Sequence, residues 1–145
     1  MLHQKIIFYA ILLLEVYSKI IVGQEIGKIF ILSDAESQFG TVECEFILEK
    51  DVLKSMLKNT LNYVMFNNYE NDLTILGDDR IVLFSSNTYV EKDDVFHLFS
   101  KSNVEKLMNL GNSKFCNFQK REKAFTIQNG QFVLEFSIPC PPMCH

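Results

Sequence analysis

The sequence lacks tryptophan, contains only three prolines and six glycines, and has no long apolar segment among its 145 residues. Its longest apolar run, residues 6–14, is too short to cross about 30 Å of hydrocarbon as a helix. No stable membrane span is therefore expected, either in this run or in the mature chain that would remain after removal of an amino-terminal leader. No Asn-x-Ser/Thr triplet is present, so N-linked glycosylation is not expected either.

The motifs of familiar catalytic and nucleotide-binding sites are also missing. There is no glycine-rich phosphate loop and no HExxH or GxSxG motif, so nothing supports hydrolysis or nucleotide chemistry by those routes. The acidic pairs at 78–79 and 93–94 lack the alternating oxygen ligands of a calcium loop and suit turns and helix caps instead. We therefore predict no catalytic site, no metal site and no cofactor.

The composition indicates a folded, acidic domain. Hydrophobic residues make up 48% of the chain and include 13 phenylalanines, which is enough to bury a core and excludes disorder of the polar, charge-rich type. The formal net charge is −4 at pH 7, so the chain has no general attraction for a phosphate backbone. Nucleic acid is therefore not expected as a partner.

Residues 1–23 have the order of a secretory signal peptide. Lys5 stands before the apolar run, and the small residues Ser18 and Gly23 follow it. Cleavage after Ser18 and cleavage after Gly23 both satisfy the preference for a small residue, so both remain open. We expect a secreted, extracellular protein in which residues 24–145 form a single domain.

Four cysteines follow the leader: Cys44, Cys116, Cys140 and Cys144. An even number in an exported chain predicts two disulfides. Because two prolines separate Cys140 from Cys144, we expect these two to bond elsewhere, and the alternation of residues 132–140 favours Cys44–Cys140 with Cys116–Cys144. The alternatives are zinc binding or haem attachment by Cys140, Cys144 and His145.

The predicted fold class is α+β, with two helices packed on an antiparallel sheet in ββα-ββα-ββ order and disulfide staples. Apolar patterns predict strands at 28–32, 41–48, 73–76, 80–84, 124–128 and 131–136, and helices at 51–66 and 95–110. The second helix could be two short helices with a bend. Asn129-Gly130 predicts a hairpin turn that sets Ile127 opposite Phe132. A weak internal sequence similarity, repeated after about 42 to 44 residues, leaves open whether the chain contains a duplicated unit.

One segment combines aromatic and cationic residues in the manner of an interface anchor. We expect it to form a tethered loop that binds protein, through Lys114, Phe115, Phe118, Lys120 and Arg121. His97 could form an acid, imidazole and ammonium row with Asp93 and Lys101 on a helix, but a surface histidine beside a helix cap is the simpler interpretation.

These observations favour a secreted protein-binding domain, acting as a soluble ligand, effector or inhibitor of an extracellular protein. The phenylalanine, leucine and methionine content leaves open an extracellular carrier of an apolar small molecule or lipid. A secreted enzyme without a familiar motif, with His97 as its catalytic candidate, is the third hypothesis.

Overall fold

The computed structural model describes residues 25–70, 72–86 and 94–140, and strands hold 48% of them. The predicted signal peptide, Asp93, Cys144 and His145 lie outside the described residues. The elements follow in the order β1 Lys28–Ile31, α2 Leu32–Phe39, β2 Val42–Glu49, α3 Lys50–Leu57, β3 Tyr63–Tyr69, β4 Asp72–Leu76, η1 Asp78–Arg80, β5 Val82–Ser85, β6 Phe96–Ser100, α4 Lys101–Leu110, β7 Phe115–Arg121, β8 Phe125–Asn129, β9 Phe132–Glu135 and β10 Ile138–Cys140.

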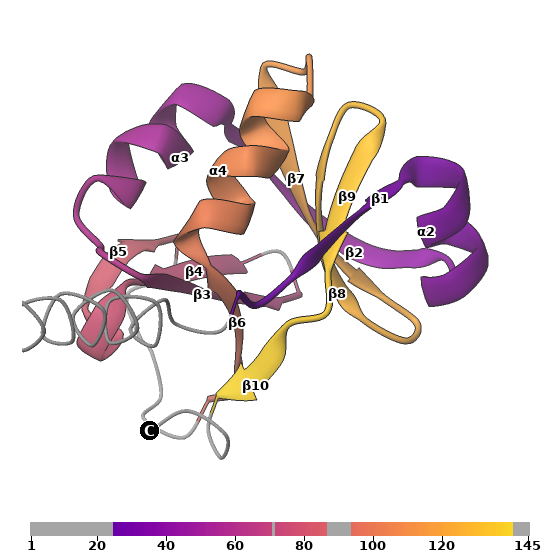
Figure 1. Ribbon diagram of the computed structural model, residues 1–145. Helices are drawn as coiled ribbons and strands as arrows, with labels where there is room; N and C mark the ends of the chain where they lie inside the picture. The colour runs from indigo at the N-terminus through magenta and orange to yellow at the C-terminus, as the bar shows by residue number, and fades with distance from the viewer. Residues whose placement is uncertain (1–24, 71, 87–93, 141–145) are drawn as a thin grey trace, which may run out of the picture.

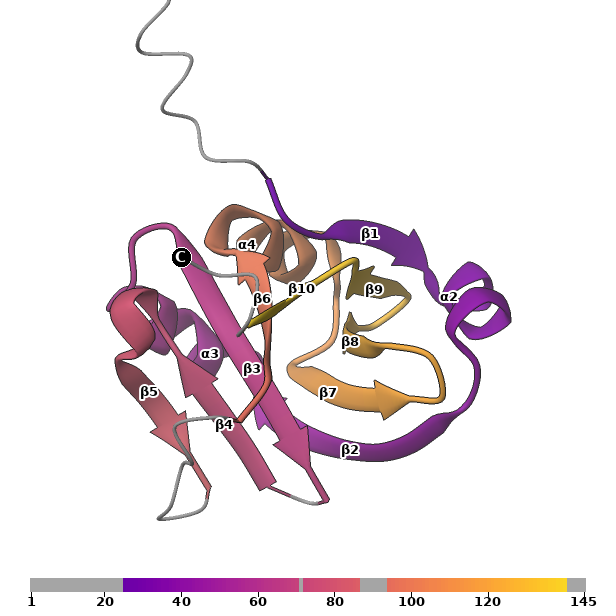
Figure 2. The ribbon, with the colours of Figure 1, turned by 90° about the horizontal axis from the view of Figure 1, so that it is seen from below.

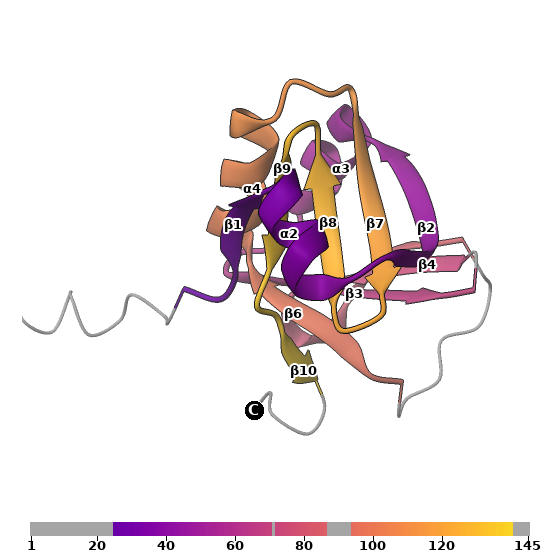
Figure 3. The same ribbon diagram turned by 90° about the vertical axis from the view of Figure 1, so that its right-hand side faces the viewer.

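The strands form two antiparallel five-stranded sheets, which we call sheet A and sheet B (Figure 1). Sheet A has the order β1-β9-β8-β7-β2, and sheet B has the order β10-β6-β3-β4-β5. Figure 2 shows the two groups of strands side by side, and Figure 3 shows α2 in front of sheet A with α3 and α4 beyond it. The predicted fold, one sheet under two helices, is therefore wrong.

The two helices are shorter than predicted, and each predicted helical segment contains a strand in the structure. α3 ends at Leu57, and β3 follows where the helix was expected to continue; the second predicted helix contains β6 before α4 begins at Lys101. The error has a physical reason, because Val64 and Met65 fit a helical spacing while Val64 and Phe66 also alternate as a strand does. In the folded chain Val64 and Phe66 face one core cluster, and Met65 lies in another on the opposite face of sheet B.

The fold contains two units with the same order of elements, and these units exchange their first strands. One unit is β2-α3-β3-β4-β5 and the other is β6-α4-β7-β8-β9, so each is a strand, a helix and a three-stranded meander. The strand β2 pairs with β7 of the other unit, and β6 pairs with β3 of the first. Equivalent residues lie about 50 positions apart, not at the interval of the internal sequence similarity.

The strand registers of the two units agree residue by residue. Phe46 lies opposite Phe118 in sheet A, and its equivalent His97 lies opposite Phe66 in sheet B. The same exchange appears in the backbone at the helix starts. Lys50 N donates to Lys114 O at 2.8 Å, and Lys101 N donates to Asn62 O at 2.9 Å. The chain is therefore related to itself by an approximate two-fold axis between β3 and β7.

Two lysines tie the helices together in the same reciprocal way. The ammonium of Lys50, the first residue of α3, donates to Gly111 O at 3.2 Å beyond the end of α4. The ammonium of Lys101, the first residue of α4, donates to Thr60 O at 3.0 Å beyond the end of α3. Each cation thus satisfies a carbonyl near a helix carboxyl end, where the helix dipole favours positive charge.

The main core lies between the two sheets and under α3 and α4. Both units contribute equivalent residues to it, and the rings of Phe66 and Phe118 meet with centroids 5.1 Å apart. A second cluster on α2 packs Phe39 against Phe30 and Val133 on the other face of sheet A. Because both units supply each sheet, neither unit can bury its apolar face alone.

The predicted disulfides are wrong, since Cys44 and Cys116 are both free and no disulfide joins two cysteines within residues 25–70, 72–86 and 94–140. The prediction assumed that Cys140 continues the inner face of residues 132–138. Instead, Phe136 adopts φ +67 and turns the chain out of sheet A, so that β10 joins sheet B. Cys140 is consequently buried in a cluster on the outer face of sheet B, away from Cys44 on β2.

Candidate functional site

The predicted protein-binding residues do not form one loop, because four of the five lie on β7 inside sheet A. Successive residues of a strand point to opposite faces, so Phe118 and Lys120 share one face of β7 and Phe115 and Arg121 share the other. Phe115 and Lys120 are exposed, while Phe118 is wholly buried in the main core and Arg121 is only 4% exposed. Each face of β7 thus carries one exposed and one buried residue of the predicted set, and the five residues form no single patch.

Arg121 is a structural residue that fastens α2 to sheet A. Its Nε donates to Thr126 Oγ1 at 3.1 Å, and its two terminal nitrogens donate to Gly40 O at 3.0 Å and to Gln119 Oε1 at 2.8 Å. Burial lowers the pKa of this guanidinium, although Glu36 and Glu45 act in the opposite direction. Sequence reasoning missed this role because the hydrogen-bond partners come from separate segments of the chain.

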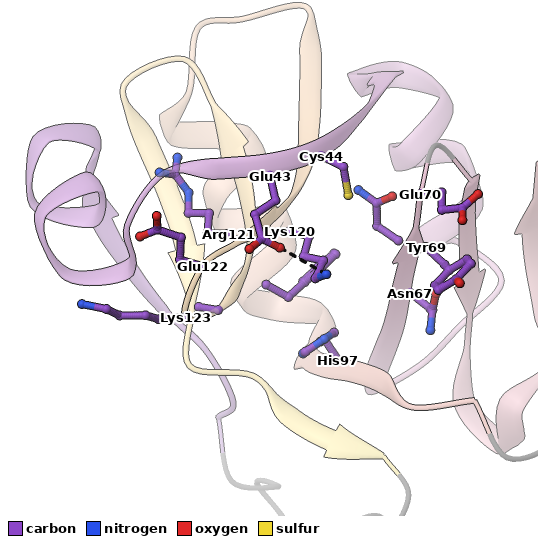
Figure 4. A pocket seen from close by; sticks show the side chains of 13 residues that line it. Glu43, Cys44, Asn67, Tyr69, Glu70, His97, Lys120, Arg121, Glu122 and Lys123 are labelled. Atoms are coloured by element: carbon purple, nitrogen blue, oxygen red, sulfur yellow. Dashed lines mark ion pairs between the residues drawn. The ribbon is translucent and has the colours of Figure 1, made fainter.

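A cleft of about 580 Å³ opens where the two sheets meet, and we call it the dyad cleft because equivalent segments of both units line it. Figure 4 shows Glu43 and Cys44 of β2 on one side of it and Tyr69 and Glu70 on the other. The lining residues are Glu43, Cys44, Asn67, Asn68, Tyr69, Glu70, His97, Lys120, Arg121, Glu122, Lys123, Ala124 and Phe125. Of the predicted patch, Lys120 and Arg121 belong to this lining.

A β-bulge orients the β2 wall of the cleft. The register with β7 shifts between Val42 and Cys44, which leaves Glu43 as the extra residue. A bulge redirects side chains, and here Glu43 and Cys44 both line the cleft although they are consecutive. Glu43 Oε2 lies 3.1 Å from Lys120 Nζ, and this hydrogen bond is the main reason that the pKa of Lys120 is raised. Both side chains are well exposed, so the pair can exchange partners at little cost.

His97 lies on β6 and not on a helix, so its predicted row with Asp93 and Lys101 on one helix face is wrong. It is not a surface histidine either. Its ring stacks on Phe125 with centroids 4.7 Å apart and planes 9° apart, and Nδ1 is 3.1 Å from Ser137 Oγ. Burial lowers the pKa of His97, which favours the neutral imidazole as one wall of the cleft.

Asn68 has an unused hydrogen-bonding group at the cleft. Its side chain is only 8% exposed, and Nδ2 donates to Phe118 O at 2.8 Å across the approximate dyad. Its Oδ1 has no partner among the described residues. A buried carbonyl without a donor loses free energy, on the order of 1–3 kcal/mol, that a suitable N–H or O–H group can restore.

Within the described part of the chain, no group of three or more His, Cys, Asp and Glu residues is arranged to hold a metal ion. None of its helices is long and apolar enough to span a membrane. No protein-family model matches the chain, and neither a curated protein nor a solved structure is similar to it.

Proposed function

We propose that this chain is an exported protein-binding domain that holds part of its partner in the dyad cleft. The observation that carries the proposal is the unpartnered, buried carbonyl of Asn68 at the wall of a cleft built by both units. A polypeptide supplies N–H donors along its whole length, so a partner's main chain or amide side chains can satisfy this oxygen.

The chemistry of the cleft supports a protein as the occupant. Tyr69 is 71% exposed at its edge and offers the large, amphipathic surface that dominates interface energetics. Around it lie acidic and basic side chains in nearly equal number, as in the polar rim of an interface. The main core beneath is filled by packed apolar side chains from both sheets and from α3 and α4. The phenylalanine content that suggested a lipid carrier is therefore explained by packing within the protein.

The test begins with affinity capture of the tagged, exported chain from extracellular material, followed by titration with the purified candidate partner. Lys120→Glu and Tyr69→Ala should each weaken binding by about tenfold or more while the circular dichroism spectrum is retained. Lys106→Glu is the matched control, because Lys106 is exposed on α4 and does not line the cleft. Arg121 is unsuitable for charge reversal, since its burial makes unfolding the expected result.

Two outcomes would overturn the proposal. One is a partner whose affinity is the same for both cleft variants as for the unmodified chain. The other is native mass spectrometry that finds a bound lipid and no protein partner, which would favour the carrier hypothesis instead.

A further inference from the structure

The two units differ at two sheet edges. At one edge, β1 covers β9 while the equivalent β5 is the last strand of sheet B. The difference at the other edge, between β6 and β2, identifies an interaction surface. In sheet B, the outer edge of β6 is covered by β10, with Leu98 opposite Ile138 and Phe96 opposite Cys140. In sheet A, the equivalent strand β2 is the last in the order, and no strand among the described residues pairs with its outer edge. Among the described residues, the outer edge of β6 is therefore paired, while the equivalent outer edge of β2 is open.

The hydrogen-bonding pattern of the two edges is also equivalent. Lys101 N bonds to Asn62 across the β6–β3 ladder, whereas the preceding residue, Ser100, directs its N–H outward to Ile26 O at 3.0 Å. Alternate residues of an antiparallel strand direct their main-chain groups to opposite sides. On β6 the outward residues are Phe96, Leu98 and Ser100, and Pro139 of β10 lies opposite His97, where no N–H is needed.

By the same alternation, the outward residues of β2 are Glu45, Ile47 and Glu49. Lys50 N bonds to Lys114 O across the β2–β7 ladder, so the residue before it, Glu49, directs its main-chain groups away from β7. Ile47 is 53% exposed and Glu45 and Glu49 are exposed as well. The open edge therefore presents acidic side chains on both sides of an apolar one.

We propose that β2 accepts an extended, basic segment of a partner protein as an added antiparallel strand, in the way that β6 accepts β10. This inference rests on the proposed function, because it describes how part of the bound partner is held. Main-chain hydrogen bonds supply the affinity of such an added strand, and side-chain positions supply the specificity. A segment that alternates lysine or arginine with an aliphatic residue places its basic side chains beside Glu45 and Glu49 on one face and its aliphatic side chains on the opposite face, where Phe46 and Leu48 lie.

The inner side of the same edge favours this occupant. Phe46 and Leu48 of β2 are only partly buried against the main core, and the ring of Phe46 meets Phe84 of β5 with centroids 6.1 Å apart. An added strand would cover these side chains on the face opposite Ile47. The aliphatic residues of the partner are thus given apolar contacts, while its basic residues remain near carboxylates.

A second copy of this chain is a poorer occupant of the edge. An antiparallel pairing of β2 with β2 centred on Ile47 sets Glu45 opposite Glu49 at both ends. Like charges directly opposite each other in a sheet are destabilising. The charge pattern therefore selects against self-association and for a basic partner.

The probe for the test is a short synthetic peptide of alternating lysine and valine, titrated into the exported chain. Amide hydrogen exchange read by NMR should slow at Glu45, Ile47 and Glu49, and an otherwise identical peptide of glutamate and valine should have no effect. Ile47→Pro removes one outward N–H and should weaken binding about tenfold or more. Ile47→Ala keeps that N–H and should weaken it less than about threefold.

The outcomes separate this inference from the proposed function. Protection elsewhere on the chain, or none at millimolar peptide, overturns strand addition, and this measurement needs no variant. A purified partner that binds Ile47→Pro normally but fails to bind Lys120→Glu also overturns strand addition and leaves the cleft proposal standing. A partner whose binding is weakened by Ile47→Pro but by neither cleft variant overturns the proposed binding in the dyad cleft and supports strand addition at β2.

Discussion

The contact between Phe66 and Phe118 offers the sharpest test of the strand exchange between the two units. These equivalent residues come from different units, both are fully buried, and their rings meet near the approximate dyad. If the units share one core, the two side chains must stabilise the fold together and not independently. Replacement by leucine is the suitable perturbation, because it keeps the site apolar and leaves a smaller cavity than alanine would.

The size of the effect follows from the atoms removed. Phenylalanine loses roughly three ring carbons on replacement by leucine, and at about 0.8 kcal/mol per buried carbon the lost burial alone lowers the unfolding free energy of each single variant by about 2 kcal/mol. An aromatic pair in contact contributes about 1 kcal/mol beyond burial, and both single variants remove that contribution. Each single variant should therefore lose about 3 kcal/mol in total and the double variant about 5 kcal/mol, whereas independent sites would lose about 6 kcal/mol together.

Urea unfolding of the four proteins, followed by circular dichroism and by tyrosine fluorescence, measures this coupling. Phe66→Leu combined with Phe30→Leu is the matched control, since Phe30 packs on α2 at the other face of sheet A and its effect should add to that of Phe66. The exchange of strands also requires a single transition with both probes. Additive losses for Phe66 and Phe118, or two separate transitions, would refute the shared core.

Two further predictions concern the dyad cleft. Because burial lowers the pKa of His97 below its ordinary value of 6.5, the unfolded chain binds more protons than the folded chain near that pH. Stability should therefore fall as the pH drops from about 7.5 to about 5, and His97→Phe should remove that part of the fall. In native buffer iodoacetamide should alkylate Cys44, which is partly exposed, at least about tenfold faster than Cys116, which is buried. Equal rates at the two thiols would contradict the placement of Cys116 in the main core.

Local patterns predicted six of the ten strands in the described part of the chain, missed β3, β6, β7 and β10, and could not predict how strands are shared between the sheets. The strands at 28–32, 41–48, 73–76, 80–84, 124–128 and 131–136 are confirmed to within a few residues. Pairing β2 with β7 is a long-range choice that depends on core contacts such as Phe46 beside Phe118, and nothing in the sequence of β2 identifies its partner. The helix predictions were wrong for a related reason, because tertiary packing decided between helix and strand at Val64.

The terminal hairpin shows how the hydrogen bonds of one buried side chain change a predicted strand register. The turn was expected at Asn129-Gly130, yet Asn129 is the last residue of β8 and lies opposite Phe132, so that Ile127 pairs with Leu134. Its buried Nδ2 donates to Ser113 O at 3.1 Å and to Phe115 O at 2.8 Å. These bonds draw Asn129 into the sheet and move the turn one residue along the chain, which a local turn preference cannot reveal.

In a domain built from two equivalent units, the residues most informative about function are those that differ between equivalent positions. Where both units need the same packing they keep it, as Phe66 and Phe118 do. Where the units diverge, packing does not impose the choice: β6 is covered by β10 while β2 is open, and His97 stands where the other unit has Phe46. These two divergences lie on the side of the molecule formed by β2 and the dyad cleft; a third is that β1 covers β9 while the equivalent β5 is the last strand of sheet B. The proposed binding surface, which runs from the cleft along β2, would account for the divergences at β2 and at His97 together.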